Sequence, residues 1–193
     1  MANNRIKKDY EAFLDGYKPA LLIKNDAKIF SRLVEKYPSV LAYKRKDFDM
    51  YLFFQTEKCK KKYLHQNRGY EEDTYEDHYL LGVTLGFPKK SVEFFSELYG
   101  GRLSLEEQQE KERYKVGIRW AGFCFSTHLD LIEQEIDWLW NQYLHPKSEN
   151  QPLYVWDYEE NYLEVPYRNL NKLREVCEYI RKKRGLIPTY TNK

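Results

Sequence analysis

The stretch from Asp73 to Leu98 constrains the fold of this chain more than any other. Asp73 or Thr74 can cap a helix, and Glu76 three residues after Asp73 completes a capping box, so a helix is predicted to begin here. Gly86 can adopt the left-handed conformation that closes a helix, and Pro88 suits the first position of the next one. The stretch therefore predicts two short helices joined by a tight turn, a central αα-hairpin against which other elements pack.

The apolar residues of this stretch fall where two crossing helices would bury them against each other. They are Leu81, Leu85, Phe87, Val92 and Phe95. The same spacing fits a DNA-binding helix-turn-helix, whose second helix would present four side chains to the major groove: Lys89, Lys90, Glu93 and Phe94. Between Glu71 and Glu97, however, seven acidic residues oppose two lysines, whereas a surface that binds phosphates is basic. A packed corner of the core is the preferred interpretation, and nucleic-acid binding stays as the alternative.

The composition indicates a soluble domain that is unusually rich in aromatic side chains. The 193 residues suit one domain, and the formal charge of +2 implies no strong attraction to nucleic acid or membranes. Aromatic residues make up 17%, with 18 tyrosines, and tyrosine serves cores and binding surfaces alike. Cys59, Cys124 and Cys177 are far apart, which is typical of reduced thiols. Because no signal peptide or membrane-spanning run is recognisable, we expect a cytoplasmic protein without a membrane partner.

Outside the hairpin, short apolar runs alternate with amphipathic ones. Strands are expected at 19–24, 39–43, 48–55 and 116–125, and helices at 4–14, 26–36, 56–64, 105–114 and 169–183. Another helix is expected to start at Thr127, because Leu129, Ile132 and Ile136 begin a continuous apolar stripe. The predicted fold class is α+β, with a small, mostly antiparallel sheet packed by several helices.

The run from Pro146 to Pro152 is the clearest linker in the sequence. Residues 1–145 are therefore expected to form an α+β core domain. Residues 146–193 would supply the linker, an aromatic and acidic segment and a C-terminal helix that packs on the core.

Two motifs within about the first hundred residues carry a resemblance. The first runs from Pro19 to Lys24 and is followed by Ile29 and Phe30, and the second runs from His78 through Leu-Gly-Phe-Pro at 85–88. Their order resembles an uncharacterised family from Firmicutes and other anaerobes, in which a helix ends in leucine-glycine-tyrosine-proline. That family has glutamate and isoleucine-glycine directly after its histidine and a cysteine-rich continuation, and this chain has neither. The resemblance implies an order of elements and no chemistry.

Three side chains are candidates for a shared ligand pocket: His78, Arg119 and His128. Glu76 and Asp77 precede His78, but successive residues on a helix do not converge on one ion, so no metal site is predicted. The sequence contains no nucleophile elbow, no phosphate-binding glycine loop, no HExxH pair and no dinucleotide fingerprint. No catalytic residue and no cofactor is therefore predicted.

Two kinds of surface are candidates for binding larger partners. Lys44, Arg45 and Lys46 would join Lys89 and Lys90 as nucleic-acid contacts if these clusters converge; solvated, separate faces are the alternative. Tyr154, Trp156 and Tyr158 would share one side of a strand ringed by acidic residues, as aromatic anchors do at protein interfaces. Packing of that strand against the helix that carries Trp138 explains the same aromatics without a partner.

These observations support three hypotheses about function. The first is a non-enzymatic, cytoplasmic binding or regulatory protein of bacterial, phage or mobile-element origin, of a defence or anti-defence type, that acts through a protein–protein surface. The second is a nucleic-acid-associated regulator that uses the helix pair. The third is a small-ligand binder or an enzyme with a site near His78, Arg119 and His128. The oligomeric state is left open.

Overall fold

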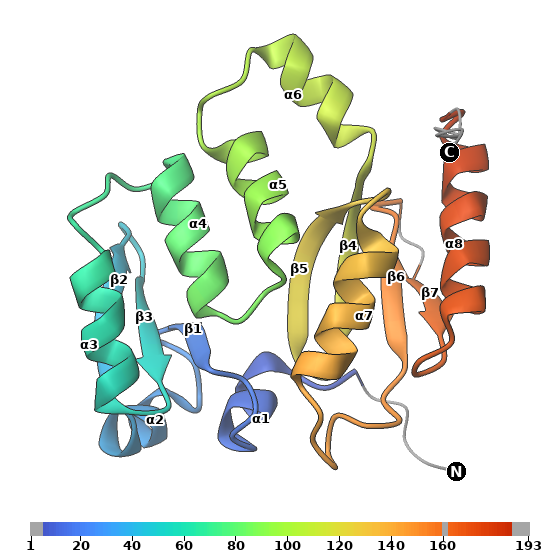
Figure 1. Cartoon of the computed structure of the whole chain (residues 1–193). Coiled ribbons are helices and arrows are strands. Elements are labelled where there is room, and N and C mark those ends of the chain that lie inside the picture. The colour runs from blue at the N-terminus through green and yellow to red at the C-terminus, as the bar shows by residue number, and fades with distance from the viewer. Residues whose placement is uncertain (1–5, 160–161, 187–193) are drawn as a thin grey trace.

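The computed structural model describes residues 6–159 and 162–186, which form two antiparallel sheets, each with its own helices (Figure 1). This arrangement confirms the α+β class, although the strands divide into two sheets instead of one. The described helices are α1 (Asp9–Leu14), α2 (Phe30–Lys36), α3 (Glu57–Gln66), α4 (Tyr75–Thr84), α5 (Lys89–Tyr99), α6 (Leu105–Glu112), α7 (Ile132–Gln142) and α8 (Leu170–Lys183). The strands are β1 (Ala20–Lys24), β2 (Ser39–Lys44), β3 (Asp49–Phe54), β4 (Lys115–Trp120), β5 (Phe123–His128), β6 (Leu153–Trp156) and β7 (Tyr162–Val165).

The first sheet, of order β1-β3-β2, is covered by helices on both faces. Side chains alternate along a strand, so successive residues of β3 point to opposite layers. Leu21 and Phe53 pack with residues of α1 and α2, whereas Leu52 and Phe54 pack with residues of α3 and α4. Burial on both sides explains the unbroken apolar run at the end of β3.

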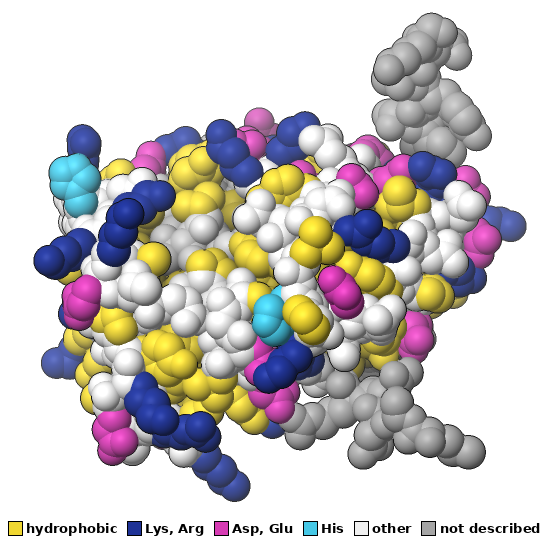
Figure 2. All heavy atoms as spheres, turned by 60° about the horizontal axis from the view of Figure 1, so that its bottom comes forward, with side chains coloured by type: hydrophobic (Ala, Val, Ile, Leu, Met, Phe, Trp, Pro, Cys, Tyr) yellow, Lys and Arg dark blue, Asp and Glu magenta, His cyan; other side chains and the backbone are white. Residues whose placement is uncertain are grey.

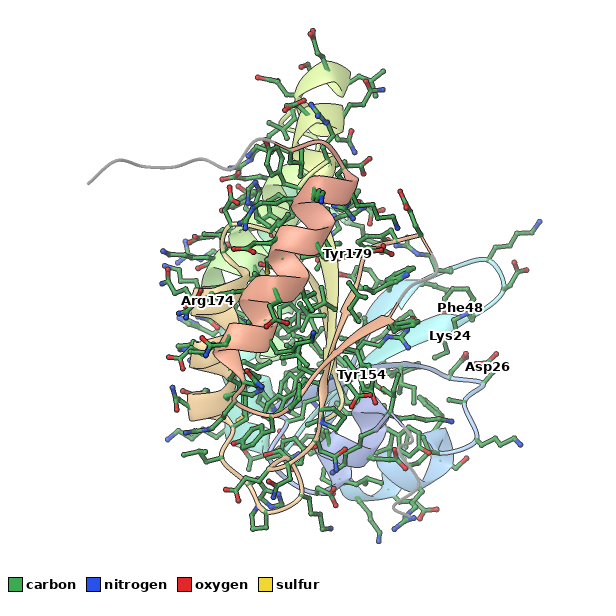
Figure 3. The ribbon with its side chains drawn as sticks, turned by 90° about the vertical axis from the view of Figure 1, so that its right-hand side faces the viewer. Lys24, Asp26, Phe48, Tyr154, Arg174 and Tyr179 are labelled. Carbon is green, nitrogen blue, oxygen red and sulfur yellow. The ribbon has the colours of Figure 1, made fainter. Side chains whose placement is uncertain are left out.

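The second sheet, of order β5-β4-β6-β7, is fully covered on one face only. On that face Ile118 and Val155 are buried with residues of α7 and α8. The opposite face, called the open face below, carries Arg119 and Trp156 beside Cys124, which is exposed. Figure 3 shows α7 on one side of this sheet and, on the other side beyond Tyr154, Lys24 of β1 with Asp26 and Phe48 of connecting segments.

The predicted αα-hairpin is present as α4 and α5, which lie side by side in Figure 1. The hydroxyl of Thr74, next to the predicted cap Asp73, accepts from the backbone N–H of Asp77. Gly86 has a φ of 82° and ends α4, as expected. A Cβ at Gly82 would lie 2.8 Å from both γ-carbons of Val92, so the small residue permits the close approach of the two helices.

The turn between β4 and β5 docks the second sheet onto the N-terminal part of the chain. Ala121 and Gly122 have φ values of 45° and 89°, which matches the twist of a two-residue hairpin turn. A Cβ at Gly122 would lie 2.5 Å from the Cβ of Ala12, so glycine is needed for this approach. Lys18, only 3% exposed, donates from Nζ to the Gly122 carbonyl oxygen at 3.1 Å.

The region after residue 115 differs from the sequence-based expectation, because the single strand expected at 116–125 is the hairpin of β4 and β5. Thr127 was expected to cap a helix, but β5 continues to His128 and α7 begins at Ile132. Thr127 pairs with Val116 in the ladder and its side chain is buried, so sheet pairing outweighs its capping preference. The segment after residue 146 supplies β6, which lies between β4 and β7, so it is hydrogen-bonded into the second sheet.

A buried carboxylate joins α5 to the second sheet. Glu135 of α7 is 4% exposed and accepts hydrogen bonds from the backbone N–H and the hydroxyl of Ser91, at 2.9 and 3.1 Å. The Ser91 hydroxyl also lies 2.8 Å from the Thr127 hydroxyl of β5. Because Ser91 is in the first turn of α5, the carboxylate also interacts favourably with the helix dipole.

None of the helices in the described part of the chain has the length and apolar character that a membrane span requires.

We expect Glu135→Ala to lower the free energy of unfolding by about 3 kcal/mol, because it leaves buried donors of Ser91 unpaired. Urea denaturation at neutral pH measures this change. Glu133→Ala is the matched control on the same helix, since Glu133 makes only an exposed ion pair with Arg174, which water and salt screen. Equal losses in the two variants would contradict the role assigned to Glu135.

Candidate functional site

A cavity of about 310 Å³ lies between the α4–α5 hairpin and the open face of the second sheet. Its walls come from five elements and two connecting segments that are distant in the sequence. The lining residues are His78, Leu81, Gly82, Leu85, Phe87, Ser91, Val92, Phe95, Gly117, Ile118, Arg119, Cys124, Phe125, Ser126, Trp156 and Tyr158. Most of them are apolar, and a mainly apolar concavity with a few polar groups is the usual form of a small-molecule site.

The helical wall consists of the residues that the sequence assigned to the interface within the hairpin. Leu81, Phe87 and Phe95 are only partly buried and face the cavity. They do so because α4 and α5 already contact each other closely at Gly82 and Val92. The larger side chains therefore project past the helix crossing towards the sheet.

The sheet wall depends on a glycine and two aromatic rings. Gly117 pairs with Ser126 on one side and with Trp156 on the other. A Cβ at Gly117 would lie 3.0 Å from Cε3 of Trp156, so the indole ring lies directly over the glycine. The ring centroids of Trp156 and Tyr158 are 4.1 Å apart, and the hydroxyls of Tyr158 and Ser126 are 2.6 Å apart.

Polar groups are few in this cavity, and its basic side chains face no acid in the described lining. Arg119 and His78 line it, and the described lining includes no aspartate or glutamate. The Arg119 guanidinium carbon lies 5.2 Å from the ring centroid of Tyr162. The rings of His78 and Phe95 are nearly perpendicular, and their centroids are 5.4 Å apart. Burial raises the pKa of Tyr158, so its hydroxyl stays protonated at neutral pH.

The structure brings together residues from two separate predictions. His78 and Arg119, from the predicted ligand pocket, line one cavity with Trp156 and Tyr158, from the predicted aromatic patch. Tyr154 occupies the open face in register with Arg119 but does not line the cavity.

His128, the third member of the predicted pocket, lies outside the cavity. Its ring stacks on Tyr114 at 4.9 Å and meets Phe94 at 5.3 Å, both between centroids. Burial in this aromatic setting lowers the pKa of His128, although Asp130 opposes the shift. Its position at the end of β5 points its ring towards α5 and the segment before β4, away from the lining.

The predicted nucleic-acid contacts do not converge. Arg45 forms an ion pair with Glu72, just before the start of α4, whereas Lys89 and Lys90 begin α5, beyond the other end of α4. Lys89 pairs with Glu93, and Lys90 donates to Gln134. Lys44 and Lys46 flank Arg45 at the end of β2 and in the following turn. Figure 2 shows Lys and Arg side chains scattered among acidic and apolar ones on the face that it presents.

The face of α5 that a helix-turn-helix would insert into DNA is partly covered. Phe94, which shares this face in the helix-turn-helix hypothesis, is 6% exposed and packs against His128 of β5. A recognition helix needs its reading face free of the protein core.

Metal-binding side chains do not gather anywhere in the described residues: no group of three or more His, Cys, Asp or Glu could hold an ion. The cavity residues that were not predicted as site residues include Gly117, Cys124 and Ser126. They carry no motif, and the strand register identifies them, because it pairs Cys124 with Arg119 and places Gly117 between Ser126 and Trp156.

Comparison of the chain with protein-family models, with curated proteins and with solved structures gave no match. The resemblance to the Firmicute family therefore stays a prediction, and the function must be inferred from the geometry of this cavity.

We expect Gly117→Val to lower the free energy of unfolding by about 2 kcal/mol, because the new side chain would overlap the Trp156 ring. In a Trp156→Ala background the same substitution should cost little, since the space is then empty. A double-mutant cycle by urea denaturation measures this coupling. Additive effects of the two substitutions would contradict the contact between Gly117 and Trp156.

Proposed function

We propose that this protein is a binding protein for a small, mainly apolar molecule, which it holds in the cavity between the α4–α5 hairpin and the second sheet. The observation that carries the proposal is the cavity itself. Leu81, Phe87 and Phe95 leave apolar surface facing a partly open cavity that no side chain of the described residues fills. A ligand that covers this apolar surface and removes it from water lowers the free energy of the system.

The volume of the cavity suggests the size of the ligand. An engineered apolar cavity of ~150 Å³ in another protein holds one benzene molecule. The cavity here, about 310 Å³, is twice as large, so it suits a body of about two fused rings or a comparable aliphatic chain.

The aromatic residues favour a small molecule over a protein partner. The rings of Trp156 and Tyr158 pack on each other with their centroids 4.1 Å apart, and both residues line the cavity. Rings that are engaged with one another inside a concavity are poorly placed to enter the pockets of a partner protein. A protein partner and a regulatory role in bacterial or phage defence stay predictions.

The free state of the cysteines supports the predicted cytoplasmic location. Cys59, Cys124 and Cys177 are all free thiols, which is the state expected in a reducing compartment such as a cytoplasm.

The proposal predicts that the neutral dye N-phenylnaphthylamine binds with micromolar affinity and becomes more fluorescent. Cys124→Trp should abolish this binding, because Cys124 lines the cavity and a tryptophan there would occupy it. A fluorescence titration measures the dissociation constant in each variant.

Cys59→Trp is the matched control, since Cys59 is an exposed cysteine on α3 that does not line this cavity. This variant should bind the dye as the unmodified protein does. Dye binding that survives Cys124→Trp, or no binding to the unmodified protein, would overturn the proposal.

A further inference from the structure

Arg119 is the one strongly basic side chain in the described lining of the cavity. It projects from the middle of β4 on the open face, in register with Cys124 and Tyr154. Its guanidinium is partly buried over the ring of Tyr162, at 5.2 Å from the centroid. Stacking on an aromatic ring satisfies the faces of a guanidinium and leaves the N–H groups along its edge free to donate.

The N–H groups along the edge of this guanidinium donate to no group of the described residues. Most arginines of the described chain have a carboxylate or carbonyl partner: Arg45 pairs with Glu72, Arg174 with Glu133 and Arg181 with Asp130. No hydrogen bond or ion pair joins Arg119 to any described residue. The acid in the same row of the sheet is Glu164, and Tyr154 lies between it and Arg119.

A second unneutralised basic group lies behind the cavity wall. Lys18 is buried, and its Nζ lies 5.6 Å from the ring centroid of Phe87, which lines the cavity. Among the described residues, the Nζ of Lys18 donates one hydrogen bond, to the carbonyl oxygen of Gly122 and not to a carboxylate. Burial lowers the pKa of Lys18, while Asp9 and Cys124 oppose the shift. When this amine is protonated, its charge adds positive potential behind the cavity wall.

From this arrangement we infer that the ligand is a small organic carboxylate, with its apolar body among Leu81, Phe87 and Phe95 and its carboxylate on Arg119. The inference rests on the proposed function and adds the chemistry of the ligand's polar end. A carboxylate matches the planar fork of one guanidinium through two parallel hydrogen bonds. A phosphate monoester carries more charge and would call for further donors than one arginine supplies.

The test compares two probes of the same shape, naphthoate and naphthamide, which differ in the charge of the polar group. Each probe competes with N-phenylnaphthylamine in a fluorescence titration at low ionic strength. We expect naphthoate to bind about tenfold more tightly than naphthamide, because a charge-assisted pair replaces a neutral hydrogen bond. In Arg119→Met the two probes should bind about equally tightly, and in Arg119→Lys part of the preference for naphthoate should remain.

Arg32→Met provides the matched control. Arg32 is an exposed arginine of α2, which packs on the first sheet, and it does not line the cavity. Its loss should leave the preference for naphthoate near tenfold.

The outcomes separate this inference from the proposal on which it rests. If the dye binds and naphthamide competes as well as naphthoate, the ligand is not a carboxylate and the apolar binding function stands. The same conclusion follows if Arg119→Met keeps the preference. If the dye fails to bind at all, the binding function itself is wrong.

Discussion

The hydrogen bonds that Glu135 accepts from Ser91 fix the position of the α4–α5 hairpin, and with it the shape of the cavity. They hold the first turn of α5 against α7 and the edge strand β5. A buried carboxylate is costly without partners, so these bonds define one docking position instead of a range of them. Tyr143 adds a second attachment, since its hydroxyl donates to the Gly86 carbonyl at 2.7 Å. The hairpin is thus attached at the sheet edge and stands over part of the open face.

The contrast between the two sheets explains why the cavity lies beside the second one. The first sheet has helices on both faces, and its strands are apolar on both sides. The second sheet packs α7 and α8 on one face, while the other carries Arg119, Cys124 and Ser126 among the aromatics. Polar residues on that face cannot form a dry core with the leucines of α4. The leucines and phenylalanines therefore face a space in which an apolar ligand can replace water.

Local signals sufficed to predict the hairpin but not the site. The cap before α4, the glycine at 86 and Pro88 act within a few residues of one another, so the sequence alone indicates both helices and the turn. The cavity instead requires that Gly117 lie between Ser126 and Trp156, which depends on the pairing of strands far apart in the chain. His128, which the sequence grouped with His78 and Arg119, shares the open face with Cys124 and Ser126, because alternate residues of β5 point the same way. It lies at the end of the strand, against Tyr114 and Phe94, so its distance along β5 places it outside the cavity lining.

Backbone conformation at the cavity supports a binding role for the aromatic wall. Tyr158 has a φ of 68°, in the left-handed region that costs a bulky residue on the order of 1 kcal/mol. Asp73 and Asn150 also adopt positive φ, but their short polar side chains tolerate it. At Tyr158 the conformation is maintained by the hydroxyl contact with Ser126 and by packing on Trp156. These contacts turn the tyrosine ring back over the sheet, so a strained backbone position is kept where it completes the wall of the cavity.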